Sequence, residues 1–167
     1  MAGGAITIKG GVGSSDDGSD GGNGGRVTLQ GGEGKGVNAD VDRGGNVELL
    51  GGKSAGGIGG HITVKSGFGM TTSSGHVTIT TANAGTEGVT GVIRMQTGVS
   101  TSGNSGLISL TTGKAVAGKA GDITLDVGTG DTGNGGDMVL TAGQATGAPD
   151  GAITTFGGAV DLRSGFG

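Results

Sequence analysis

A fifteen-residue repeat is the feature of this sequence that most restricts its fold. Residues 106–150 form three consecutive units of equal length, which begin at Gly106, Gly121 and Gly136. Each unit starts with Gly, skips one residue, and then places two apolar residues on either side of a third. We call such a pair an aliphatic doublet. A fixed period of this length is typical of repeat proteins, in which one small structural unit is stacked many times.

The doublet recurs along nearly the whole chain. From Val47 onward the step is 15 residues, except for one step of 16 between Val77 and Ile93, whereas the first two steps are 21 and 20. The doublets are Ile6/Ile8, Val27/Leu29, Val47/Leu49, Ile62/Val64, Val77/Ile79, Ile93/Met95, Ile108/Leu110, Ile123/Leu125, Met138/Leu140 and Ile153/Thr155. Val160 and Leu162 form a further alternating pair within the last unit, which predicts a second short strand there, opposite the strand of Ile153 and Thr155. Alternation of this kind predicts one short β-strand in each unit.

Glycine supplies 46 of the 167 residues, and phenylalanine is the only aromatic residue, present three times. So much glycine opposes helices, and so few large side chains leave little to fill a core. The sequence therefore predicts an all-β fold, a flat two-sided parallel β-solenoid with about 15 residues per coil and roughly ten coils, Gly-rich turns and a thin core. An antiparallel meander with one strand per unit is the competing fold, which we disfavour because every unit is alike.

We expect a single solenoid domain over residues 1–167. Within it, coils with long loops would span 4–44, regular fifteen-residue coils 45–150, and a terminal coil 151–167. The insertions of the first two units are polar and Gly-rich, as expected for loops on one face of a repeat array.

Charge and hydropathy exclude several classes of function. The net charge is −4 and the charges are scattered, whereas nucleic-acid binding needs a basic stripe. No apolar run approaches the roughly 18 residues that a membrane helix requires. The start of the chain lacks the basic and then hydrophobic segments of a signal peptide. We therefore predict neither a nucleic-acid partner nor a membrane span.

Runs such as SGHVTITTANAG, SGNSGLISLTTG and GDITLDVGTGDTGNGGDMVLTAG carry a resemblance to a known group of proteins. They resemble the long glycine-rich repeat proteins of diatoms, related algae and oomycetes, and the resemblance covers nearly the whole chain. Those proteins are regarded as wall, adhesive or filament components outside the cell. The resemblance implies an extracellular or cell-surface protein with a structural role, although the signal peptide is not present in this sequence.

Threonine recurs between the two members of a doublet. On a solenoid these side chains would form one row along a flat face, which is the surface that ice or a carbohydrate would need. The simpler explanation is that Thr has a high strand propensity on an exposed face. The candidate residues for a ligand or ice surface are Thr7, Thr28, Thr63, Thr78, Thr124 and Thr154.

Aspartate clusters in the two long loops near the start of the chain. Carboxylates of neighbouring coils could share a calcium ion, although a solvated acidic turn is the simpler explanation. The candidates are Asp16, Asp17, Asp20, Asp40 and Asp42. His61 and His76 would stack in adjacent coils, but no third ligand accompanies them, so we expect solvated surface side chains there. We predict no cofactor other than this calcium.

The sequence presents no catalytic set, so we do not expect an enzyme. There is no Cys nucleophile, and no pair of carboxylates lies in an evident cleft. We expect a structural protein, a segment of a fibre, cell wall or adhesive, that acts by rigidity and by self-association, end to end or with further repeats. The alternative is a binding module that uses the Thr-bearing face for ice or a polysaccharide.

Overall fold

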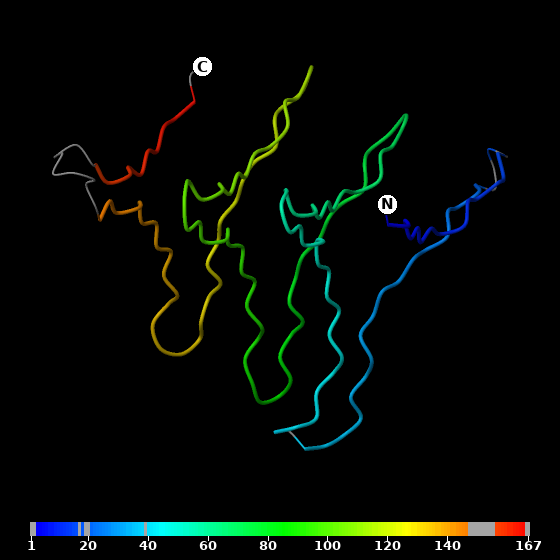
Figure 1. Ribbon diagram of the computed structural model, residues 1–167, viewed down its shortest axis with the longest axis horizontal. Coiled ribbons are helices and arrows are strands. Elements are labelled where there is room, and N and C mark those ends of the chain that lie inside the picture. Colours follow the sequence, from blue (N-terminus) through cyan, green and yellow to red (C-terminus); the bar gives the residue numbers. More distant parts are fainter. Residues whose placement is uncertain (1–2, 17, 19–20, 39, 147–155, 166–167) are drawn as a thin grey trace. The chain divides into compact units, whose positions relative to one another are not determined.

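The computed structural model describes residues 3–16, 18, 21–38, 40–146 and 156–165, and in this part of the chain it contains no helix and no β-strand (Figure 1). The chain divides into two compact units, Met1–Gly91 and Val92–Gly167. Each unit consists of short segments that carry the doublets and of loops that connect them. The expectation of one domain over residues 1–167 stays a prediction.

The predicted parallel β-solenoid is wrong. Its coils would be joined by ladders of backbone hydrogen bonds, and none of the described residues takes part in a strand, so there is neither a sheet nor a stack of coils. The competing meander would need strands as well. Glycine loses more conformational freedom on ordering than any other residue, so a Gly-rich segment forms a strand only when burial of its apolar side chains offsets that cost. Here that burial does not occur.

No core is present in the described residues, neither the predicted thin one nor any other, because no hydrophobic and no polar side chain there is buried. The accessible surface of the chain is 16687 Å². A compact protein of the same mass, 15.6 kDa, would expose about 7,300 Å². Most of the apolar surface that folding normally removes from water therefore stays in contact with it.

In five of the loops between consecutive doublets, a backbone hydrogen bond joins the beginning of the loop to its end. The donor is the Gly two residues before a doublet, and the acceptor is the Gly three residues after the preceding one. The bonds run from the N–H of Gly25 to the carbonyl of Gly11 (2.8 Å), Gly45 to Gly32 (2.8 Å), Gly60 to Gly52 (2.8 Å), Gly75 to Gly67 (3.0 Å) and Gly158 to Gly143 (2.8 Å). We call these contacts loop closures.

We call the two backbone segments on either side of a closing hydrogen bond the legs of the loop. The two legs run in opposite directions. In the first long loop, Gly25 bonds to Gly11 and Gly22 bonds to Ser15 at 3.2 Å, so residue numbers rise on one leg as they fall on the other. The narrow loops that result are visible in Figure 1. A closure therefore brings two glycines together locally, without pairing the doublets that follow it into a ladder.

At a loop closure, the two backbone segments lie too close together to leave room for most side chains. A Cβ atom added at Gly45 would lie 2.8 Å from the amide nitrogen of Gly32, and one added at Gly31 would overlap the carbonyl oxygen of Gly45. At Gly32 the same addition would meet nothing within 4 Å. Part of the high glycine content is thus explained by close contact between the legs.

Four further loops lack a closing hydrogen bond in the described part of the chain. In them the residue two places after the doublet is β-branched, namely Thr81, Thr97, Thr112 or Val127. A Cβ atom added at Gly121 would lie 3.6 Å from the Cβ of Thr112, and one added at Gly136 would lie 2.9 Å from Cγ1 of Val127. In these loops the legs therefore meet through a side chain instead of through the backbone.

Candidate functional site

The aliphatic doublets form the most extensive candidate interaction surface. Between the ends of the chain, the first members of the described doublets are exposed by 48% (Val27) to 57% (Ile62), and the second members by 62% (Leu110) to 71% (Ile79). Monomeric proteins rarely leave so many large aliphatic side chains in water. The narrow spread shows that each repeat holds its doublet in nearly the same surroundings.

Neighbouring repeats account for part of the cover that each doublet has. Ile6, which has no repeat before it in this sequence, is exposed by 92%, and Leu162 is exposed by 85%. Their counterparts in the other repeats are covered to a greater extent. A doublet is therefore shielded in part by the chain that flanks it on both sides, and the remaining apolar surface is open.

The last doublet lies seven residues later than the fifteen-residue step predicts. Gly158 closes the loop that starts at Gly143, and Val160 is exposed by 51%, within the range of the other first members. Val160 and Leu162 therefore occupy a doublet position, whereas we interpreted them as a second strand opposite Ile153 and Thr155. The latter two lie outside the described residues. The spacing of 22 residues from Met138 to Val160 matches the long steps at the start and could have indicated this.

The described threonines of the predicted surface do not form a row. Thr7, Thr28, Thr63, Thr78 and Thr124 are exposed, and Thr154 lies outside the described part. A flat array of hydroxyls requires strands in register, and the described residues form no strand. The side chains are open to solvent, but no sheet aligns them.

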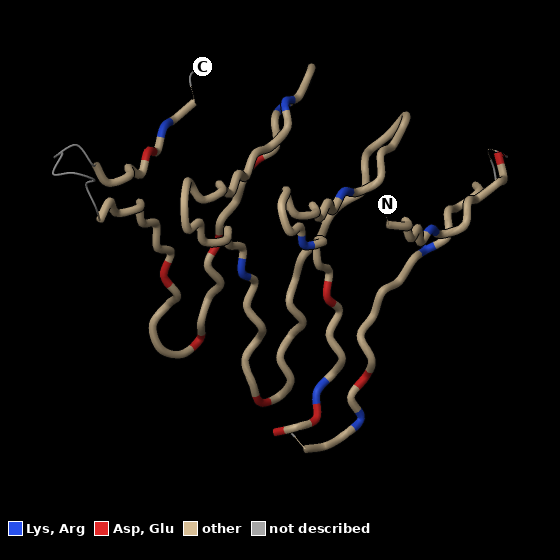
Figure 2. Tube along the Cα trace, in the orientation of Figure 1, with Lys and Arg blue, Asp and Glu red and all other residues tan. Residues whose placement is uncertain are grey.

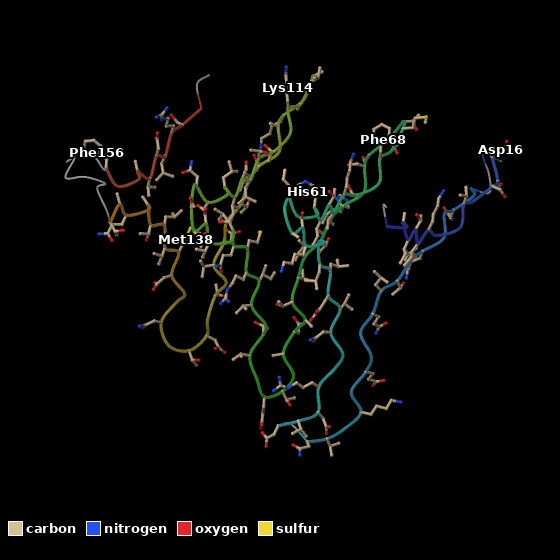
Figure 3. The ribbon with its side chains drawn as sticks, viewed as in Figure 1. Asp16, His61, Phe68, Lys114, Met138 and Phe156 are labelled. Carbon is tan, nitrogen blue, oxygen red and sulfur yellow. The ribbon has the colours of Figure 1, made fainter. Side chains whose placement is uncertain are left out.

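In the second acidic loop, local hydrogen bonds join Asn38 to Asp40 and Asp42 in a turn. Asp42 accepts a hydrogen bond from the amide of Asn38 at 2.8 Å, and the side chain of Asn38 accepts one from the amide of Asp40 at 3.1 Å. The bond from the Asp40 amide to the Asn38 side chain is typical of an Asx turn, in which a short polar side chain caps the backbone two residues further on. Asp16 is exposed (Figure 3), and Asp17 and Asp20 lie outside the described residues.

Within the described ranges, no three His, Asp or Glu side chains come together in a way that could hold a metal ion. His61 and His76 are both exposed. The residues that the structure describes form no pocket, and Figure 3 shows side chains such as Phe68 and Lys114 extending from the chain into open space. The described part of the chain thus offers open surface and no enclosed binding site.

In the described part of the chain, two ion pairs link charged residues close in sequence. Lys119 donates to Asp122 at 2.8 Å, and Arg163 donates to Asp161 through Nε at 2.9 Å and also through Nη2. Both pairs are largely exposed, so each contributes little to stability. Their importance lies in the charges that they neutralise near a doublet.

No protein-family model matches the chain, and neither a curated protein nor a solved structure shows significant similarity to it. Among the described residues, no helix has the length and apolar character needed to span a membrane.

Proposed function

We propose that this chain is a structural repeat protein that works by self-association, as a segment of an extracellular fibre, cell wall or adhesive. The observation that supports the proposal most directly is the combination of regular aliphatic doublets with the lack of any buried residue in the described part. A separate chain in this state leaves its main source of folding free energy unused. Contact with further copies would supply the missing burial.

The composition supports association over simple disorder. Disordered segments combine few hydrophobic residues with a high net charge. Here hydrophobic residues make up 31% of the chain and the net charge is −4 over 167 residues. Complete burial of one Val, Leu or Ile side chain stabilises by about 1.5–3 kcal/mol, so the exposed half of each doublet member represents about 1 kcal/mol. Several doublets together could hold two copies in contact.

Ice binding has less support. That alternative needs a flat, regularly spaced row of Thr side chains, and the described Thr residues are not aligned by a sheet. Self-association needs only repeated apolar surface, which is present. Placement outside the cell rests on the resemblance of the repeats to algal and oomycete surface proteins, and labelling of intact against permeabilised cells with an antibody would test it.

Sedimentation velocity with two single variants tests the proposed function. Leu125→Asp places a carboxylate within a doublet, where association would bury it without a partner, so we expect the dissociation constant to rise at least tenfold, about 1.4 kcal/mol. Thr124→Asp introduces the same charge at the residue between the doublet members and is the matched control, which should associate like the natural sequence. A chain that sediments at 15.6 kDa at every concentration would refute self-association.

A further inference from the structure

Charges next to the doublets are basic in the first unit. We call the residue before a doublet and the residue after it the flanking positions. In the unit Met1–Gly91 the charged residues at these positions are Lys9, Arg26 and Lys65, all exposed, and His61 and His76 occupy two more. No flanking position in this unit carries an acidic residue.

The flanking charges of the second unit have the opposite sign. Asp122, Asp126 and Asp137 flank its doublets and are exposed. Asp122 pairs with Lys119, whereas the described residues provide no ion pair for Asp126 or Asp137. The single basic flanking residue, Arg163, is neutralised by Asp161.

Outside the flanking positions the two signs are mixed. The loops of the first unit carry both acidic residues, such as Glu33 and Asp42, and basic ones, such as Lys35 and Arg43. Figure 2 shows both blue and red segments along the first unit. The segregation by sign is therefore a property of the residues beside the doublets and not of the units as a whole.

We propose that a second copy of this chain binds head to tail, with the basic flanking positions of the first unit of one copy against the acidic flanking positions of the second unit of the next. This proposal rests on the proposed self-association and specifies its direction. Contact between like units would bring equal charges together next to buried apolar surface, which opposes association. Contact between unlike units pairs opposite charges while the doublets of both copies leave water.

A second copy suits these surfaces better than a charged polysaccharide does. A polyanion would be attracted to Lys9, Arg26 and Lys65 but repelled by Asp122, Asp126 and Asp137. Another copy of the chain provides partners for both sets. A head-to-tail contact uses two different surfaces and leaves one of each free after every addition, so it continues into an open chain of copies.

Charge-reversal variants of the full chain test the proposal by sedimentation velocity. The first variant carries Lys9→Glu, Arg26→Glu and Lys65→Glu, and the second carries Asp122→Lys, Asp126→Lys and Asp137→Lys. We expect each variant alone to associate at least tenfold more weakly than the natural sequence, because all its flanking charges then have one sign. An equimolar mixture should recover association, and so should a chain that carries all six changes.

The matched control reverses Lys35, Arg43 and Lys53, which lie in loops of the first unit away from flanking positions. It changes the net charge as much as the first variant does, and we expect it to associate like the natural sequence. The natural sequence should also associate more weakly as NaCl rises from about 0.05 to 0.5 M, since salt screens exposed charges.

The outcomes separate the two proposals. If the natural sequence associates and both flanking variants associate equally well, the head-to-tail arrangement is refuted while self-association stands. If the loop control weakens association as much as the first flanking variant does, net charge governs the contact and the arrangement is refuted too. If the natural sequence never associates at any concentration, both proposals fail together.

Discussion

The two units carry the same repeat, yet their loops close in different ways. In the first unit, four loops are closed by a Gly–Gly backbone hydrogen bond of 2.8–3.0 Å, and only its last loop brings Gly91 against the side chain of Thr81 instead. In the second unit, the loops that end at Gly106, Gly121 and Gly136 bring each of these glycines against a Thr or Val side chain, and only its last loop is closed by a bond, from Gly158 to Gly143. One position, two residues after the doublet, therefore decides whether the two backbone segments of a loop meet through a hydrogen bond or through a side chain.

Among the described loops, the closing hydrogen bond becomes longer and is then lost as the side chain at this position becomes larger. Gly31 and Ala142 occur in loops closed by a 2.8 Å bond, and Ser66 in a loop closed by a 3.0 Å bond. Thr112 and Val127 occur in loops without a closing bond among the described residues. A second heavy atom on Cβ occupies the space between the legs, and because β-branched side chains have few rotamers it cannot turn aside.

The largest effect should come from Gly31→Val in the first unit. The Cβ atom of the new side chain would overlap the carbonyl oxygen of Gly45, and its branched methyl groups would occupy the space between the legs, so the bond from Gly45 to Gly32 must break. A single methyl group is not enough, because Ala142 stands at the equivalent position of a closed loop. A hydrogen bond of this kind contributes about 0.5–1.5 kcal/mol, so amide exchange of Gly45 should accelerate up to about tenfold. Gly32→Val is the control, since a Cβ atom at this position meets nothing within 4 Å. Equal exchange in both variants would contradict the role of close approach.

A smaller effect is expected from Ser66→Thr, which converts a loop with a closing bond to the kind found at Thr112. The added methyl group would push the legs apart and break the bond from Gly75 to Gly67. We expect roughly threefold faster exchange of the Gly75 amide, because the bond is already long and exposed. Ser66→Ala should leave exchange unchanged, as Ala142 does in its own loop. Unchanged exchange in Ser66→Thr would show that the size of this side chain does not decide whether the loop closes.

The reciprocal change, Thr112→Ser in the second unit, should have the smallest effect. Loss of one methyl group would let the amide of Gly121 reach the carbonyl of Gly113, as Gly75 reaches Gly67. We expect roughly twofold slower exchange of the Gly121 amide, since the new bond remains exposed. Slower exchange in the neighbouring Thr111→Ser variant as well would point to a general effect of lost methyl groups.

The sequence predicted the repeat units more successfully than the fold. Val27 and Ile62 are exposed to a similar degree, which shows that the doublet is a repeated structural unit. The prediction of a solenoid was wrong because an alternating pattern indicates which side chains are equivalent. It does not indicate whether neighbouring segments form backbone hydrogen bonds with each other. The predicted strands have little apolar surface to bury against the cost of ordering the glycines around them.

For the candidate site, the sequence indicated residues with reactive or charged side chains. It did not indicate the glycines whose backbone groups form the loop closures. The calcium site at Asp40 and Asp42 stays a prediction, beside the simpler expectation of a solvated acidic turn, and the structure adds that the Asp42 carboxylate and the Asp40 amide form hydrogen bonds with Asn38. Gly11 and Gly25 carry no functional group and nevertheless determine how the first loop closes. The signal that could have found them is their fixed distance from each doublet, three residues after one and two before the next.

The central claim is that the doublets stay in water until copies of the chain meet. Methyl NMR in the presence of a soluble paramagnetic chelate measures this directly at Leu29, Leu125 and their counterparts. We predict strong relaxation of these methyl groups in dilute protein, in line with their exposure of about 64%, and protection as the concentration rises. Methyl groups already protected at the lowest concentration would show that a single chain buries its own doublets, and would contradict the account.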